Sequence, residues 1–154
     1  MIRRVEDERD FRDFHELLVE YEAALPPVLR HGSVPAVSEL EITYRGRGAA
    51  FVADVAGHAV GCVAVWELDA RTGVIARLFV RPESRGAGAA RALVLNALEF
   101  LESEGYNRVV LDTDKDRLPA AYRLYESLGF TECGPYAKVG YPCPTFMERR
   151  IGKK

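Results

Sequence analysis

The chain has 154 residues, enough for one domain with its own hydrophobic core, so we expect a single domain over 1–154. Its composition is that of an ordinary globular protein, with 48% hydrophobic and 29% charged residues. The net charge of −2 argues against a nucleic-acid binder that depends on an overall basic surface and leaves only a local basic patch open, and we expect no nucleic-acid partner.

The cysteines and the apolar segments favour a reduced, cytoplasmic location. Cys62, Cys133 and Cys143 cannot all pair within one chain, and none lies in a CxxC motif. Residues 1–10 mix both charge signs and lack the apolar centre of a signal peptide. The apolar stretch Val55–Trp66 is too short to span a bilayer. We therefore expect a cytoplasmic protein that does not bind membranes.

The first quarter of the chain predicts a short strand and two helices. Residues 2–5 favour the strand, and apolar residues at helical spacing from Asp7 to the Pro26-Pro27 pair predict the first helix. The proline-rich stretch 26–38 is typical of a loop. A weaker helix is expected over about 36–43. The helix is followed by a predicted turn over 45–48.

Three strand-like segments follow, over 50–55, 59–68 and 74–80. Residues 56–58 suit a hairpin turn, and residues 69–73 predict a second turn. In the middle strand, alternation places Gly61, Val63 and Val65 on one face. It places Val60, Cys62, Ala64 and Trp66 on the other face. Both sets are apolar, which predicts a sheet covered on both sides.

The second half alternates helices and strands. The predicted segments are a helix over 88–104, a strand over 108–112, a helix over 119–128, and closing strands over 130–133 and about 145–151. The element order is therefore βααβββαβαββ. This order predicts the α/β class (α+β in some schemes), a mixed sheet with helices on both faces.

The segment Leu78–Leu93 runs from a strand, through a loop with two glycines, directly into a helix. Gly86 and Gly88 allow the backbone to turn sharply and to approach an anion closely. The free N–H groups at the start of a helix bind phosphate oxygens, and Arg85 and Arg91 could add charge. A tight turn without a ligand is the alternative interpretation. The pattern is neither a Walker A loop nor a GxGxxG motif.

Two motifs resemble the Gcn5-related N-acetyltransferase (GNAT) superfamily. Arg85, Gly88 and Ala90 meet its Arg/Gln-x-x-Gly-x-Gly/Ala signature, and the preceding strand stands where the family expects it. Residues Ala121–Phe130 resemble the family's A-x-x-LYE-x-x-GF helix and turn. The motifs stand in the expected order with a strand between them. The resemblance implies a mixed central sheet of about six to seven strands.

The resemblance also implies acetyl-CoA as co-substrate, with no metal. In the family, the strand before the loop carries a bulge and splays from its parallel neighbour, and its free backbone pairs with the pantetheine arm. Here that backbone belongs to Leu78, Phe79 and Val80. The N–H groups implied to hold the pyrophosphate belong to Arg85, Gly86, Ala87, Gly88, Ala89 and Ala90.

Tyr125 matches the family tyrosine that protonates the departing CoA thiolate. A phenol with a pKa near 10 can donate to a thiolate with a pKa of roughly 8 to 9 when it is well placed. A core-facing tyrosine with its hydroxyl satisfied is the alternative. The implied reaction is acetyl transfer by direct attack of a primary amine, from a small molecule or a peptide.

The chain departs from the family pattern at two positions. Val74 stands where some members have a glutamate base, and Leu118 stands where many have an asparagine. The general base is therefore unassigned. Glu67, Asp112 and His31 are candidates, although each is also explained as a strand-end or loop residue.

Two further hypotheses stay open. One is a catalytically idle GNAT-fold module that binds CoA or acts as a sensor, and the other is a binder of nucleotide phosphates. The aromatic C-terminal segment, with Tyr136 and Tyr141, is expected either to wall the acceptor site or to pack the last hairpin. The sequence does not identify the acceptor, the preferred acyl chain or the oligomeric state, and it leaves a homodimer open.

Overall fold

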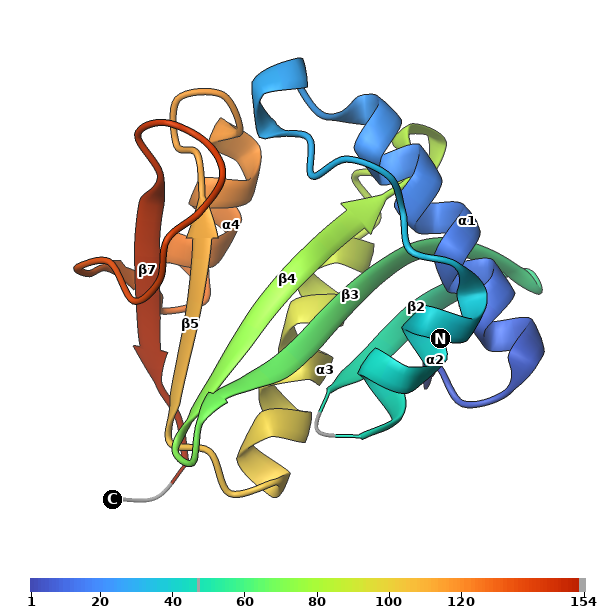
Figure 1. Cartoon of the computed structure of the whole chain (residues 1–154), viewed down its shortest axis with the longest axis horizontal. Coiled ribbons are helices and arrows are strands. Elements are labelled where there is room, and N and C mark those ends of the chain that lie inside the picture. Colours follow the sequence, from blue (N-terminus) through green and yellow to red (C-terminus); the bar gives the residue numbers. More distant parts are fainter. Residues whose placement is uncertain (47, 153–154) are drawn as a thin grey trace.

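A computed structural model describes residues 1–46 and 48–152 as one seven-stranded sheet with the strand order β1-β2-β3-β4-β5-β7-β6 (Figure 1). The strands are β1 (Ile2–Arg4), β2 (Ala49–Val55), β3 (His58–Asp69), β4 (Thr72–Val80), β5 (Arg108–Thr113), β6 (Thr131–Glu132) and β7 (Thr145–Arg150). Pairing is antiparallel except between β4 and β5, so the sheet is mixed. The predicted α/β class and element order are confirmed.

Four α-helices connect the strands: α1 (Glu8–Ala24), α2 (Val37–Arg45), α3 (Ala89–Ser103) and α4 (Pro119–Ser127). Asp7 caps α1 in a capping box with Asp10, which explains why that helix begins where the apolar spacing begins. Short 3₁₀ turns occupy Pro27–Leu29 and Pro82–Ser84. No helix of the described residues has the length and apolarity needed to cross a membrane.

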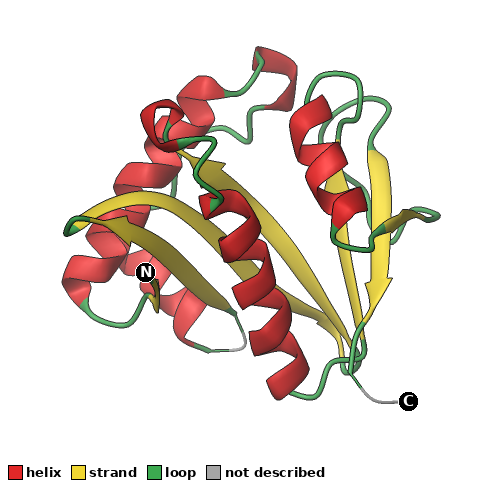
Figure 2. Cartoon of the chain, turned by 180° about the vertical axis from the view of Figure 1, so that it is seen from behind, coloured by secondary structure: helices red, strands yellow, loops and turns green. Residues whose placement is uncertain are grey.

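The helices cover both faces of the sheet, as predicted. Helices α1 and α2 lie on the face turned to the viewer in Figure 1, and α3 and α4 lie on the face shown in Figure 2. Each face has its own buried core. Phe11, Phe14 and Leu17 anchor the first, and the apolar stripe of α3 anchors the second, including Leu93 and Leu101.

Local geometry corrects three sequence-based details. The first hairpin turns over two residues, Ala56 and Gly57, both with positive φ, so His58 belongs to β3. The second hairpin also has a two-residue turn, because Asp69 pairs with Thr72 and residues 72–73 lie in β4.

Val60 packs with the α3 core rather than beside Cys62, because the register of β2 and β3 shifts next to it. The predicted turn over 45–48 starts one residue too early, because Arg45 still belongs to α2, and its residue 47 lies outside the described residues.

Strands β4 and β5 separate along their length. They pair only from Thr72–Val74 to Arg108–Val110, and Figure 1 shows them diverging beyond that point. The rest of β4 therefore pairs with β3 on one side and leaves its other backbone edge without a strand partner. This gap between β4 and β5 is the one that the family resemblance implied. The candidate site lies around it.

Candidate active site

The loop between β4 and α3 has the backbone geometry of an anion site. Gly86 and Gly88 both have φ of +86°, a conformation that disfavours residues with a side chain. A Cβ atom added to either glycine would meet nothing within 4 Å, so this face of the loop is open. The helical ladder begins with the Ala92 amide donating to the Gly88 carbonyl (3.0 Å), which leaves the preceding amides of the first turn without helical acceptors.

Arg85 is engaged with its own chain. Its amide donates to the Pro82 carbonyl oxygen at 3.3 Å, and its Nε donates to the Val80 carbonyl oxygen at 2.9 Å. Its guanidinium carbon lies 5.9 Å from the centre of the Phe79 ring. Among the residues expected to hold the pyrophosphate, Gly86 to Ala90 therefore have backbone amides that can bind it, whereas the Arg85 amide already donates to Pro82. Arg85 fixes the end of β4.

The strand before this loop carries a bulge at Arg77. Cys62 pairs with Phe79 whereas Ala64 pairs with Ala76, so β4 has one more residue than β3 over this interval. Arg77 has a φ of +59°, and its carbonyl oxygen accepts a hydrogen bond from the Cys62 thiol at 3.5 Å. The predicted bulge is thus present, directly before Leu78.

Tyr125 lies on α4, buried to 7% exposure, with its ring edge-on to Phe130 at 5.8 Å. Burial raises the pKa of its hydroxyl, and the neighbouring Tyr21 and Asp112 raise it further. The hydroxyl forms no hydrogen bond within the described part of the chain, yet no fully buried polar atom there lacks a partner. The hydroxyl therefore reaches solvent.

Asp112 is held at the carboxyl end of β5 by two tyrosines from the last loop. Tyr136 donates to its Oδ1 at 3.1 Å, and Tyr141 donates to its Oδ2 at 2.7 Å. Burial raises the pKa values of both hydroxyls, and the carboxylate raises them further. Asp112 and the aromatic segment, which the sequence analysis considered separately, are therefore brought together, and the Asp112 carboxylate acts electrostatically on Tyr125.

The other two candidate bases lie in different surroundings. Glu67 accepts a hydrogen bond from the Tyr106 hydroxyl at 2.9 Å and pairs across the sheet with Gly73, at the end where β4 and β5 are still joined. That end is opposite the loop at Gly88. His31 lies near the gap, where its Nδ1 is 2.9 Å from a carboxylate oxygen of Glu22.

The two departures from the family pattern have structural roles. Val74 is buried at 2% exposure and is the last β4 residue that pairs with β5, opposite Val110. Leu118 precedes α4, and its amide donates to the Asp114 carbonyl oxygen at 2.7 Å. Neither position supplies a polar side chain to the gap.

In the described residues, no group of three or more His, Cys, Asp or Glu side chains is placed to hold a metal ion.

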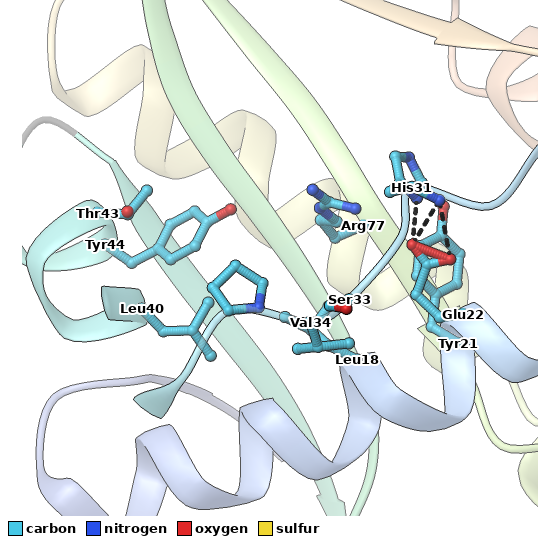
Figure 3. Close-up of a pocket in the computed structure, with 11 residues that line it drawn as sticks. Leu18, Tyr21, Glu22, His31, Ser33, Val34, Leu40, Thr43, Tyr44 and Arg77 are labelled. Carbon is cyan, nitrogen blue, oxygen red and sulfur yellow. Dashed lines mark hydrogen bonds and ion pairs between the residues drawn. The ribbon is translucent and has the colours of Figure 1, made fainter. Parts of the chain in front are cut away.

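A pocket of about 320 Å³ lies between β4 and the helices α1 and α2 (Figure 3). Its polar lining includes Tyr21, Glu22, His31, Tyr44 and Arg77. Sequence reasoning identified only His31 among these. Tyr21 lies on a predicted helix and Tyr44 directly after one, with no motif around either, and Arg77 faces the pocket because of the bulge.

The comparisons with known proteins agree with this geometry. The family model described as "Acetyltransferase (GNAT) family" matches residues 11–130. An uncharacterised N-acetyltransferase of Schizosaccharomyces pombe is 40% identical over 101 residues. That alignment covers 65% of this chain and 61% of the yeast protein, so the chain spans less than two thirds of that relative's length.

Two solved structures share the fold. YncA of Salmonella typhimurium, solved with its cofactor acetyl-CoA, has a TM-score of 0.80 and 20% identity, covering 97% of this chain and 92% of that one. The ribosomal-protein-alanine N-acetyltransferase of Brucella melitensis has a TM-score of 0.79 and 19% identity, covering 98% and 99%.

Proposed function

The chain belongs to the GNAT acetyltransferase family, and on that basis we propose that it transfers an acetyl group from acetyl-CoA to a primary amine. One observation carries the proposal: an open loop with two positive-φ glycines lies at the end of a bulged strand whose edge is unpaired. The residues present fit the co-substrate. Acetyl-CoA supplies an activated thioester, whose carbonyl carbon accepts the amine and whose sulfur leaves as a thiolate.

We propose that the amides of Gly86 to Ala90 bind the pyrophosphate. Amide N–H groups at a helix start combine direct hydrogen bonds with the positive end of the helix dipole. The backbone of Leu78 to Val80 binds the pantetheine arm as an added strand, which the absence of a β5 partner along this part of β4 supports. The Val80 carbonyl is the exception, because Arg85 already donates to it.

Tyr125 is proposed as the proton donor to the thiolate. A phenol is protonated at neutral pH, and this hydroxyl forms no hydrogen bond in the described chain that would compete for its proton. As the new C–N bond forms and the C–S bond breaks, the thiolate takes the phenolic proton. Tyr125 regains a proton from solvent, and the amine loses one to solvent. Asp112, whose charge acts on Tyr125, supplies negative charge that attracts a cationic amine into the gap.

The first test of this function is binding. A hundredfold excess of CoA over its Kd should stabilise the whole chain by about 2.7 kcal/mol, measured as a thermal shift. ATP at the same concentration should give no comparable shift, and equal stabilisation by ATP would favour a nucleotide-phosphate binder.

The second test is turnover. Thiol release from acetyl-CoA is measured across a panel of primary amines, with acetylated product identified by mass spectrometry. Amine-dependent release supports acetyl transfer. CoA binding without release from any amine would overturn the transferase proposal and favour an idle CoA-binding module.

A further inference from the structure

The pocket between β4, α1 and α2 contains a cation. Arg77 projects into it, and Figure 3 shows its guanidinium between the Tyr44 hydroxyl on one side and the Glu22–His31 pair on the other. The guanidinium acts electrostatically on Tyr21 and Tyr44, lowering their pKa values against the larger upward effect of burial. These effects put the positive charge inside the pocket.

No carboxylate among the described residues forms an ion pair with Arg77. The nearest candidate in the pocket lining is Glu22, whose side chain is 12% exposed. Its oxygens are already used, because the His31 amide donates to them at 2.7 and 3.0 Å and His31 Nδ1 lies 2.9 Å from one of them. A partly buried guanidinium that faces neutral hydroxyl groups is costly without an anion, and a bound anion would remove that cost.

The backbone at Arg77 is a second observation. A φ of +59° is uncommon for a residue with a long side chain and costs about 1 kcal/mol or more. Such conformations cluster at ligand sites. Here the bulge has a geometric effect, since it turns the side chain of Arg77 towards α1 and α2 immediately before Leu78, where the thioester arm is proposed to lie.

We propose that Arg77 binds a carboxylate of the acceptor, so that the acceptor class is a small primary amine that carries a carboxylate. This inference rests on the proposed acetyl transfer. The planar guanidinium matches a carboxylate with two parallel hydrogen bonds. A pocket of about 320 Å³ suits a molecule of amino-acid size. The carboxylate would lie beside Arg77 while the amine extends towards Asp112 and Tyr125.

The test uses matched acceptors. Acetyl-CoA is offered with the L-amino acids, with their α-amides and with the corresponding amines that lack the carboxyl group. The whole chain should use at least one carboxylate-bearing amine with a kcat/KM at least tenfold above that of its amide. For that acceptor, Arg77→Gln should raise KM by about 10- to 100-fold, as expected for losing a charge-assisted pair, and Arg77→Lys should recover part of the loss.

Controls separate this inference from the proposed function. Arg12→Gln removes an exposed cation from α1 (63% exposed), away from the pocket, and should leave KM unchanged. CoA binding, measured by thermal shift, should be the same in all four proteins. Turnover of amides or uncharged amines equal to that of the amino acids, or an unchanged KM in Arg77→Gln, overturns the carboxylate proposal alone. CoA binding without turnover of any amine overturns the proposed function, and this inference with it.

Discussion

The hydroxyl of Tyr141 donates to Oδ2 of Asp112 at 2.7 Å, across 29 residues of sequence. The same hydroxyl lies 3.1 Å from the Thr113 carbonyl oxygen, so the last loop is fastened to the carboxyl end of β5. The C-terminal segment thereby orients the carboxylate of Asp112, which acts electrostatically on Tyr125, and this arrangement can be tested.

Tyr141→Phe should loosen Asp112 without affecting the coenzyme loop. We expect the acceptor KM to rise several-fold and the free energy of unfolding to fall by about 1–2 kcal/mol, because a hydrogen bond to a charged group is lost. The measurements are steady-state kinetics and urea unfolding. Tyr122→Phe is the matched control, since Tyr122 also donates to a carboxylate, Glu132, at 2.7 Å on the exposed surface. Equal changes in KM for both variants would contradict the role given to Asp112.

Gly88→Val should abolish CoA binding while leaving a folded protein. The valine would strain a residue with φ of +86° and fill the open side of the loop. Gly57→Val is the control, because Gly57 also has positive φ (+81°) and free space where a Cβ atom would stand, but lies in the β2–β3 turn. Both variants should lose about 1–2 kcal/mol of stability. Calorimetric titration with CoA should distinguish them, and retained affinity in folded Gly88→Val would refute the assigned site.

Tyr125→Phe should lower kcat by about 100-fold, the order expected for losing a general acid. The affinity for CoA should stay the same, because the proposed contacts of the coenzyme are backbone groups of β4 and the loop. The measurement is thiol release with a productive amine. Tyr122→Phe, one turn earlier on the same helix, should retain full kcat. An unchanged kcat in Tyr125→Phe would show that the proton comes from elsewhere.

Stability should fall at alkaline pH because buried neutral groups must ionise. Burial raises the pKa of Tyr21 to about 12 and that of Cys62 to about 12. Because the folded-state pKa is raised, each buried neutral group stabilises the fold fully at pH values below its unfolded-state pKa, which is near 10 for tyrosine. This stabilisation is lost as the pH rises towards the folded-state pKa of about 12. Each group contributes a slope of at most about 1.4 kcal/mol per pH unit. Urea unfolding between pH 8 and 11.5 should show a shallower decline for Tyr21→Phe, and parallel curves would contradict the assignment.

Local sequence signals predicted the parts of the site that lie within one continuous segment. The loop at Gly86 and Gly88 follows from glycine conformation and the start of a helix, and Tyr125 follows from a motif within one helix and turn. The element order followed from apolar spacing, since each helix and strand repeats its own period.

The parts that depend on tertiary contact could not be predicted in this way. The Asp112–Tyr141 hydrogen bond joins two segments whose spacing carries no signal, although each was singled out separately. Arg77 faces the pocket between β4, α1 and α2 because one extra residue shifts the pairing of β4 with β3, and a simple alternation pattern cannot register such a shift. The same kind of shift moved Val60 to the face opposite the predicted one.

The separation of β4 from β5 bears on where the sheet exposes unpaired strand backbone. Unpaired strand backbone at the border of a sheet invites pairing with another molecule and leads to aggregation. Here the borders are β1 and β6, of three and two residues, too short to template such pairing. The long unpaired edge of β4 instead faces β5 within the sheet, so it is not a border to which a neighbouring chain could add a strand.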